Sequence, residues 1–234
     1  MLQALAGYDQ ADPASSREPV TDYTAGMRQN VRGLKVGIPR DYFFHDINPE
    51  VGSAFESAMG TLRQQGADVR EVKIPSIWAA PAFMVIMLTE AFSYHARDLR
   101  ERPHLYGEVL REKLMAGGLF TADEYVQAQR LRARLRADMH TALGDVDVLA
   151  TPTAPVTAPA FSAVFDPNFP FARSNMAPFN MSGLPALALP CGFARNGLPV
   201  SLQLAGRPFD EATVLRAGHA YEQATDWHRR RPAV

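Results

Sequence analysis

Two side chains that could attack a carbonyl carbon lie in one short stretch, PFNMSGLPALALPCGF, residues 178–193. They are Ser182 and Cys191, the only cysteine of the chain. A serine or cysteine nucleophile needs a base within hydrogen-bond reach, and many hydrolases hold the serine in a G-x-S-x-G turn. That turn is absent, and neither a C-x-x-C motif nor an identifiable partner histidine accompanies Cys191. We therefore predict that both residues are scaffold, with an independent serine or cysteine hydrolase as the alternative.

Lysine can also act as a general base when burial keeps it neutral. The chain has three lysines. We expect Lys35 and Lys73, in short strands, to face solvent or a sheet margin, and Lys113 to lie on an amphipathic helix. None of them stands beside a serine in the sequence. These residues therefore predict no catalytic group.

Metal and cofactor motifs are missing as well. The six histidines form no i, i+4 pair, H-E-x-x-H motif or cysteine–histidine cluster, and no glycine-rich phosphate loop is present. We expect neither a metal nor a cofactor. The segment RLRARLR, residues 130–136, favours a solvated helix face over RNA contact, so nucleic acid is not an expected partner. Asp145 and Asp147 are interpreted as turn residues rather than an acid–base pair.

Composition is that of an ordinary globular protein, with 47% apolar residues and a net charge of -1. One cysteine suits a reducing compartment, and residues 1–12 do not resemble a signal peptide. The longest apolar run, residues 77–88, contains Pro81 and is shorter than the roughly twenty residues that a membrane span needs. We expect that run to form a buried helix in a cytoplasmic protein with no membrane partner.

The elements that would position these side chains alternate between strands and helices. Expected strands cover residues 33–39, 67–75, 146–153, 185–190 and 198–206. Expected helices cover residues 49–66, 79–100, 105–116 and 122–143, a short piece near 173–181, and a final helix that starts after Asp210 and ends in RRRP. The expected caps are Asn48, the capping box of Thr121 with Glu124, and Asp210, and Gly66 is expected to end the first helix. The first strand, helix and strand form a βαβ unit with a parallel pair. We predict one α/β domain over 1–234, with a surface loop at 9–30 and a proline-rich loop region at 152–172.

Six segments in this order resemble successive blocks of the amidase signature family. They are LQALAGYDQADP, GLKVGIPRDYF, DVDVLATPTAP, PFNMSGLPALALPCGF, GLPVSLQLAGRPFDE and HAYEQATDWHRRRP. The resemblance implies the C-terminal half of the amidase signature fold, with a mixed β-sheet flanked by helices. It also implies hydrolysis or transfer at an amide C–N bond by a serine, a cis-serine and a lysine. Such chemistry combines an activated nucleophile with backbone stabilisation of the oxyanion.

The chain departs from the family because the lysine and the glycine–serine loop belong to a half that it does not contain. The resemblance therefore implies a pocket wall without catalytic residues. It assigns substrate contact to Phe179, Asn180 and Met181, and to Thr151 and Thr153 in a second loop at the same mouth. Residues 1–8, which lack a helix cap, are expected to be the tail of a helix that has lost its beginning.

Three functional alternatives follow from this resemblance. The first is the C-terminal portion of an amidase, inactive alone, whose complete enzyme takes a small-molecule amide. The second is a subunit that completes an amidase or tRNA-amidotransferase site with a separate chain, and the third is a non-enzymatic binding remnant of the fold. Arg173 stands where amidotransferases carry an acidic residue, which favours a general amidase. An unpaired sheet edge and an apolar face also predict self-association or a missing N-terminal partner.

Overall fold

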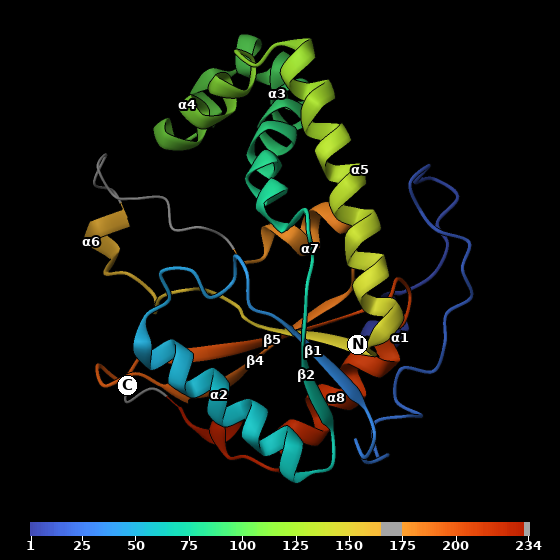
Figure 1. Cartoon of the computed structure of the whole chain (residues 1–234). Helices are drawn as coiled ribbons and strands as arrows, with labels where there is room; N and C mark the ends of the chain where they lie inside the picture. The colour runs from blue at the N-terminus through green and yellow to red at the C-terminus, as the bar shows by residue number, and fades with distance from the viewer. Residues whose placement is uncertain (165–174, 232–234) are drawn as a thin grey trace.

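Five strands form one mixed sheet in the computed structural model, which describes residues 1–164 and 175–231 (Figure 1). The strands, in the spatial order β2-β1-β3-β5-β4, are β1 (Lys35–Pro39), β2 (Asp68–Val72), β3 (Val148–Pro152), β4 (Ala186–Phe193) and β5 (Pro199–Gly206). β1 runs parallel to β2 and β3, whereas β5 runs antiparallel to β3 and β4. The predicted α/β class and mixed sheet are confirmed for the described residues.

The parallel pair arises from the predicted βαβ unit, whose helix is α2 (Pro49–Gln64). Asn48 caps this helix by accepting a hydrogen bond from the Glu50 amide, and Pro49 occupies the first turn. Gly66 follows the helix with φ +92°, a left-handed conformation that glycine adopts without a Cβ penalty. Arg40 then binds Glu56 of α2 at 2.6 Å and Glu71 of β2 at 2.8 Å. The cap and stop residues read from the sequence are confirmed.

Each face of the sheet carries its own hydrophobic core. Successive residues of β3 alternate between the two, because Val148 and Ala150 join one cluster and Leu149 the other. The first cluster contains side chains of α2 and α8 (Glu211–Gln223); the second contains side chains of α5 (Ala122–Asp145) and α7 (Ala177–Ser182). The central strands are therefore covered on both faces and hold the site described below.

Three helices extend away from the sheet as a helical arm, made of α3 (Phe83–Glu101), α4 (Glu108–Gly117) and α5 (Figure 1). Thr121 and Glu124 form the predicted capping box at the start of α5. α4 lies very close to α3, since a Cβ on Gly117 would be 2.1 Å from the Leu88 backbone oxygen. Two short 3-10 helices, η1 (Ile77–Ala82) and η2 (Pro103–Leu105), flank α3.

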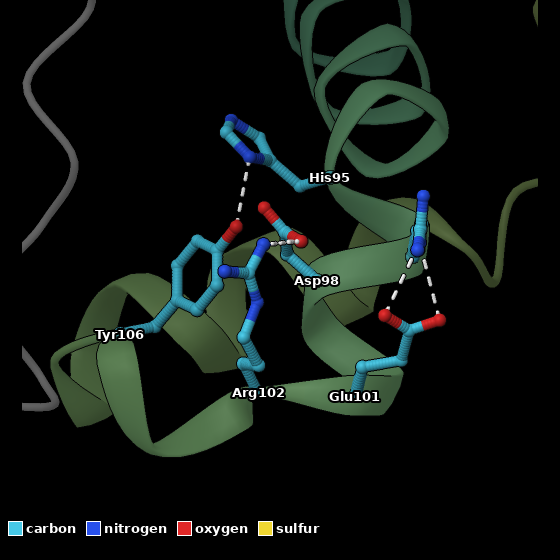
Figure 2. A network of polar contacts seen from close by, with 6 residues as sticks. His95, Asp98, Glu101, Arg102 and Tyr106 are labelled. Carbon is cyan, nitrogen blue, oxygen red and sulfur yellow. Dashed lines mark hydrogen bonds and ion pairs between the residues drawn. The ribbon is translucent and has the colours of Figure 1, made fainter.

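Polar contacts fasten the end of α3 to the segment that follows it (Figure 2). His95 Nδ1 lies 3.0 Å from the Tyr106 hydroxyl, and Arg102 donates to Asp98 at 2.5 Å. Arg102 thereby lowers the pKa of the Asp98 carboxyl. The two ion pairs of this network, including Arg97 with Glu101, join residues four apart, so they reinforce the helix end.

The apolar run 77–88 differs from the buried helix that we expected. It forms η1 and the start of α3, and only Ile77, Ala80 and Ile86 in it are buried. α3 packs against α4, α5 and α7, but most side chains of the run remain partly exposed or exposed. By length and composition alone, one helix of the described part, Ile77–Glu101, could cross a membrane, a criterion that core helices of other proteins also meet.

The end of the last helix corrects one expectation. α8 begins at its predicted cap, Asp210, but ends at Gln223, six residues before RRRP. A separate 3-10 turn, η3 (Trp227–Arg229), contains the first arginine of RRRP. The N-terminal helix is a single turn, α1 (Leu2–Leu5). Residues 9–30 form the predicted exposed turns, although Tyr23 is buried. α6 (Phe161–Val164) is the one helical turn in the described part of the proline-rich loop; residues 165–172 of that loop lie outside the described residues.

Candidate functional site

A buried polar cluster lies at the carboxyl end of β3. Thr151 (0% exposed) and Gln203 (4% exposed) are cross-strand neighbours on β3 and β5. Gln203 Nε2 donates to Thr151 Oγ1 at 3.1 Å and to the Asn175 backbone oxygen at 3.3 Å. Buried polar groups need such partners, so these bonds hold the Gln203 side chain in one position. We call Thr151, Asn175 and Gln203 the polar cluster.

Asn175 connects the segment before α7 to the end of β3. Its Nδ2 donates to Pro152 O at 2.9 Å and to Phe43 O at 3.3 Å. Asn175 Oδ1 and, two residues after Thr151, Thr153 Oγ1 are buried without a hydrogen-bond partner among the described residues. An amide oxygen can accept two hydrogen bonds, and a hydroxyl can both donate and accept. The polar cluster and the adjoining Thr153 therefore retain hydrogen-bonding capacity that the described side chains leave unused.

The five residues predicted to contact substrate lie in different environments. Thr151 belongs to the polar cluster, and Thr153 is half-buried directly after β3, where its amide donates to Ser201 O at 3.0 Å. Phe179 and Met181 are buried in the second core cluster, whereas Asn180 between them is exposed. Of the three α7 residues, Asn180 alone presents its side chain to solvent. Substrate binding by these residues stays a prediction.

α7 is held in place on both sides, which fixes the position of Asn180. Arg132 of α5 donates from Nε to the Met181 backbone oxygen at 2.9 Å. The Phe179 ring lies 5.7 Å from the Phe43 ring. Gly183 then ends the helix with φ +72°, a left-handed conformation that glycine adopts without a Cβ penalty. Arg132 therefore stabilises α7, a role that the expected solvated arginine face did not predict.

Ser182 is engaged with its own helix rather than with a base. It is 4% exposed, and its hydroxyl donates to Pro178 O at 2.8 Å with a second contact to Phe179 O at 3.2 Å. A serine bonded to the carbonyl four residues earlier satisfies its hydroxyl locally. The geometry agrees with the prediction that Ser182 is scaffold.

Cys191 is equally unsuited to attack a carbonyl. Its side chain lies in the first core cluster, and burial raises the pKa of the thiol to about 12. Reactive cysteines have a lowered pKa in an electropositive setting, because the thiolate is the nucleophile. Cys191 borders a hollow of about 440 Å³ that Glu50, Arg195 and Trp227 also line, and that hollow contains no residue of the polar cluster.

The other candidate groups are structural or exposed. Lys35, Lys73 and Lys113 are all exposed. Lys113 lies on the expected helix, α4, whereas Lys73 follows the end of β2. Asp147 links the start of β1 to Arg207. Its carboxylate accepts a hydrogen bond from the Lys35 amide at 2.9 Å and lies 3.6 Å from the Arg207 guanidinium. No group of three histidine, cysteine, aspartate or glutamate side chains suited to a metal occurs within residues 1–164 and 175–231.

The sequence interpretation missed Asn175 and Gln203, the two amide side chains of the polar cluster. Gln203 carried a signal, since it is a polar residue between the leucines of LPVSLQLAG in a strand that proves to be buried. Asn175 carried none, because its partners Phe43 and Pro152 are distant in sequence and only the folded chain brings them together. Arg173 lies outside the described residues.

Comparison with known proteins gives the chain clear relatives. The family described as Amidase matches residues 1–215. An amidase from Pseudomonas putida is 43% identical over 244 residues, covering 100% of this chain and 52% of its own length. A glutamyl-tRNA(Gln) amidotransferase subunit from Chloroflexus aggregans is 38% identical, covering 99% of this chain and 53% of its own length.

Solved structures with a similar fold also match about half of their own length to this chain. The crystal structure of a glutamyl-tRNA(Gln) amidotransferase subunit from Thermotoga maritima superposes with a TM-score of 0.76 and shares 29% identity. That match covers 93% of this chain and 48% of the other. The chain thus spans about half the length of the relatives that it matches.

Proposed function

This chain belongs to the amidase signature family, and from that membership we propose that it supplies the scaffold and one substrate-pocket wall of an amide C–N hydrolase. The observation that carries the proposal is the contrast within the described residues. The polar cluster at the end of β3 is fixed and has unused hydrogen-bonding atoms, whereas Ser182 and Cys191 are engaged or buried. We infer that the nucleophile and its base come from a complementary half.

The proposed division of labour follows from amide chemistry. Hydrolysis adds a nucleophile to the carbonyl, places negative charge on its oxygen, and then breaks the C–N bond with a proton delivered to nitrogen. The wall holds the amide in reach of that attack, because correct placement lowers the barrier. Asn180, exposed on the fixed α7, and Thr153, after β3, are the side chains proposed to hold the substrate.

A second candidate is a subunit that completes an amidotransferase site with a separate chain. It is favoured by the 38% identity with a glutamyl-tRNA(Gln) amidotransferase subunit. The higher identity of 43% with an amidase, and Arg173 in place of an acidic residue, support the general amidase. The natural amide would be a small molecule in either case.

The test measures ammonia release from simple aliphatic and aryl amides. We expect no hydrolysis by the pure chain above the rate without protein. We expect hydrolysis when the chain is combined with the part of the Pseudomonas putida amidase that it does not match. Asn180→Ala in that complex should raise KM or lower kcat, whereas Asn196→Ala, in the exposed turn between β4 and β5, is the matched control.

Two results would contradict the proposal. Hydrolysis by the pure chain that disappears in the Cys191→Ala variant would indicate an independent cysteine hydrolase. A complex that forms but hydrolyses no amide would favour the binding remnant.

A further inference from the structure

The two edges of the sheet differ in how they are protected against pairing with another strand. The β2 edge carries the exposed charged residues Asp68, Arg70 and Glu71. Arg70 donates to the Asp145 backbone oxygen, and Glu71 is bound by Arg40. Charged side chains on an edge strand discourage unwanted pairing. β4, at the other edge, has the sequence ALALPCGF and no charge at all.

The backbone of β4 has free pairing groups on its outer side. The Gly206 amide donates to Pro185 O at 3.0 Å, in register with the β4–β5 ladder. Antiparallel residues alternate between pairs that exchange hydrogen bonds and pairs that do not. Ala186 and Ala188 therefore direct their N–H and C=O groups away from β5. Within the described residues β4 is the last strand, so no further strand meets these groups.

This edge is firmly supported from one face. Leu187 packs against α8 so closely that a Cβ on Gly218 would lie 2.4 Å from Leu187 Cδ2. Between the edge and α8 lies a hollow of about 170 Å³, which Leu187, Leu215 and His219 help to line. A strand that is already rigid loses little conformational freedom when a partner adds to it.

The opposite face of the same edge is open and adjoins the polar cluster. Ala186 and Ala188 are exposed there, while the corresponding face of β5 is buried. Ala188 is the cross-strand neighbour of Gln203, which binds Thr151. A chain that covered this face would lie directly beside the proposed pocket wall.

We propose that the outer edge of β4 is the docking site for a polypeptide carrying the part of the amidase fold that this chain does not span. The partner adds a strand that hydrogen-bonds to Ala186 and Ala188 and places its own residues beside the polar cluster. The relatives argue for this occupant, because the matched region is 52% of the amidase and 48% of the solved amidotransferase subunit. This inference rests on the proposed function and names where the complementary half binds.

The test compares three variants for binding to the unmatched part of the Pseudomonas putida amidase. Ala188→Lys puts a charge on the edge, and Ala188→Pro removes the outward N–H without removing a β4–β5 hydrogen bond. Ala133→Lys, at an exposed position on α5, adds the same charge elsewhere. We expect both Ala188 variants to bind roughly tenfold more weakly than wild type, and Ala133→Lys to bind like wild type.

Hydrogen–deuterium exchange locates the contact independently of folding defects in the variants. Complex formation should slow exchange of the Ala186 and Ala188 amides and leave residues 68–72 of β2 unchanged. Three results would overturn the docking site: protection at β2 alone, wild-type binding by Ala188→Lys, or no complex at all. If exchange of these amides is already slow in the pure chain and the amidase part does not change it, a second copy of the chain occupies the edge. That result would also overturn the proposal. A β4-dependent complex that hydrolyses no amide would instead overturn only the proposed function.

Discussion

Single residues decide whether the polar cluster at the end of β3 is rigid. Gln203 spans the space between Thr151 and Asn175 with one amide group, at a position that is almost fully buried. A side chain of similar size without an amide would occupy the same space but leave both acceptors without their donor. The cost of unsatisfied buried polar atoms then exceeds any gain from the added apolar surface.

Gln203→Leu is accordingly expected to lower the free energy of unfolding by about 1–3 kcal/mol. Gln64→Leu is the matched control, because Gln64 is exposed on α2, and its change should stay within about 0.5 kcal/mol. Urea unfolding of both variants measures the difference. Equal losses in the two variants would show that the Gln203 hydrogen bonds contribute nothing.

The buried thiol makes a pH-dependent prediction. Burial raises the pKa of Cys191 to about 12, and burial likewise raises the pKa of its neighbour in the core, Tyr221, to about 12. Each raised pKa favours the protonated form in the folded state. The resulting stability is therefore complete below the pKa of the unfolded group and is lost as pH rises toward 12.

Through Cys191, the free energy of unfolding should fall by roughly 1 kcal/mol between about pH 9 and about pH 10. The free energy of unfolding of the Cys191→Ala variant should fall by about 1 kcal/mol less than that of wild type over the same interval, whatever the stability of the variant at neutral pH. Urea unfolding at the two pH values gives both slopes. Parallel slopes would mean that the thiol ionises without unfolding, which would revive its candidacy as a nucleophile.

At the scale of elements, close helix contacts determine which glycines are essential. A Cβ on Gly117 would meet the Leu88 backbone oxygen at 2.1 Å, and backbone cannot move aside as a flexible side chain can. Gly60 in α2 offers the opposite case, since nothing lies within 4 Å of its Cβ position. Both residues lie in helices, where alanine is intrinsically the better residue.

We therefore expect Gly117→Ala to destabilise the fold by about 1–3 kcal/mol by pushing α4 from α3. Gly60→Ala should stabilise it by about 0.5–1 kcal/mol. Thermal and urea unfolding measure both changes. A stabilising Gly117→Ala would show that α4 moves away from α3 at no cost.

Elements that the sequence predicted well are those with local signals. Asn48, Thr121 and Asp210 each cap the helix assigned to them, because a cap bonds to amides two or three residues away. The predicted end of α8 was wrong, because the arginines of RRRP are favourable at the end of a helix but do not make the helix continue to that point. The prediction that residues 77–88 are buried was also wrong, because apolar composition does not reveal how many elements pack around a helix.

At the scale of the whole molecule, the helical arm leaves large apolar side chains in solvent. Tyr94 of α3 is 84% exposed, Leu105 of η2 is 66% exposed, and Leu119, between α4 and α5, is 83% exposed. Exposed apolar side chains favour association when they gather on one surface. The proposed docking edge of β4 adds a second uncovered surface.

The chain without a complementary half is therefore expected to associate as its concentration rises. Sedimentation velocity across a concentration series measures this, and a Leu105→Gln, Leu119→Gln double variant should associate less. Thr141→Gln, at an exposed position on α5, is the control. A well-behaved monomer at every concentration would contradict the expectation.

The sequence by itself determined the family, the βαβ unit and the helix caps, because these depend on neighbouring residues or on the order of motifs. Only the tertiary structure decided that Gln203, Asn175 and Thr151 form one cluster, that Arg132 anchors α7, and that β4 is the uncharged edge. Those features join residues as much as 132 positions apart, as Asn175 and Phe43 show. Strand order and burial set such contacts, and neither is encoded within a local stretch of sequence.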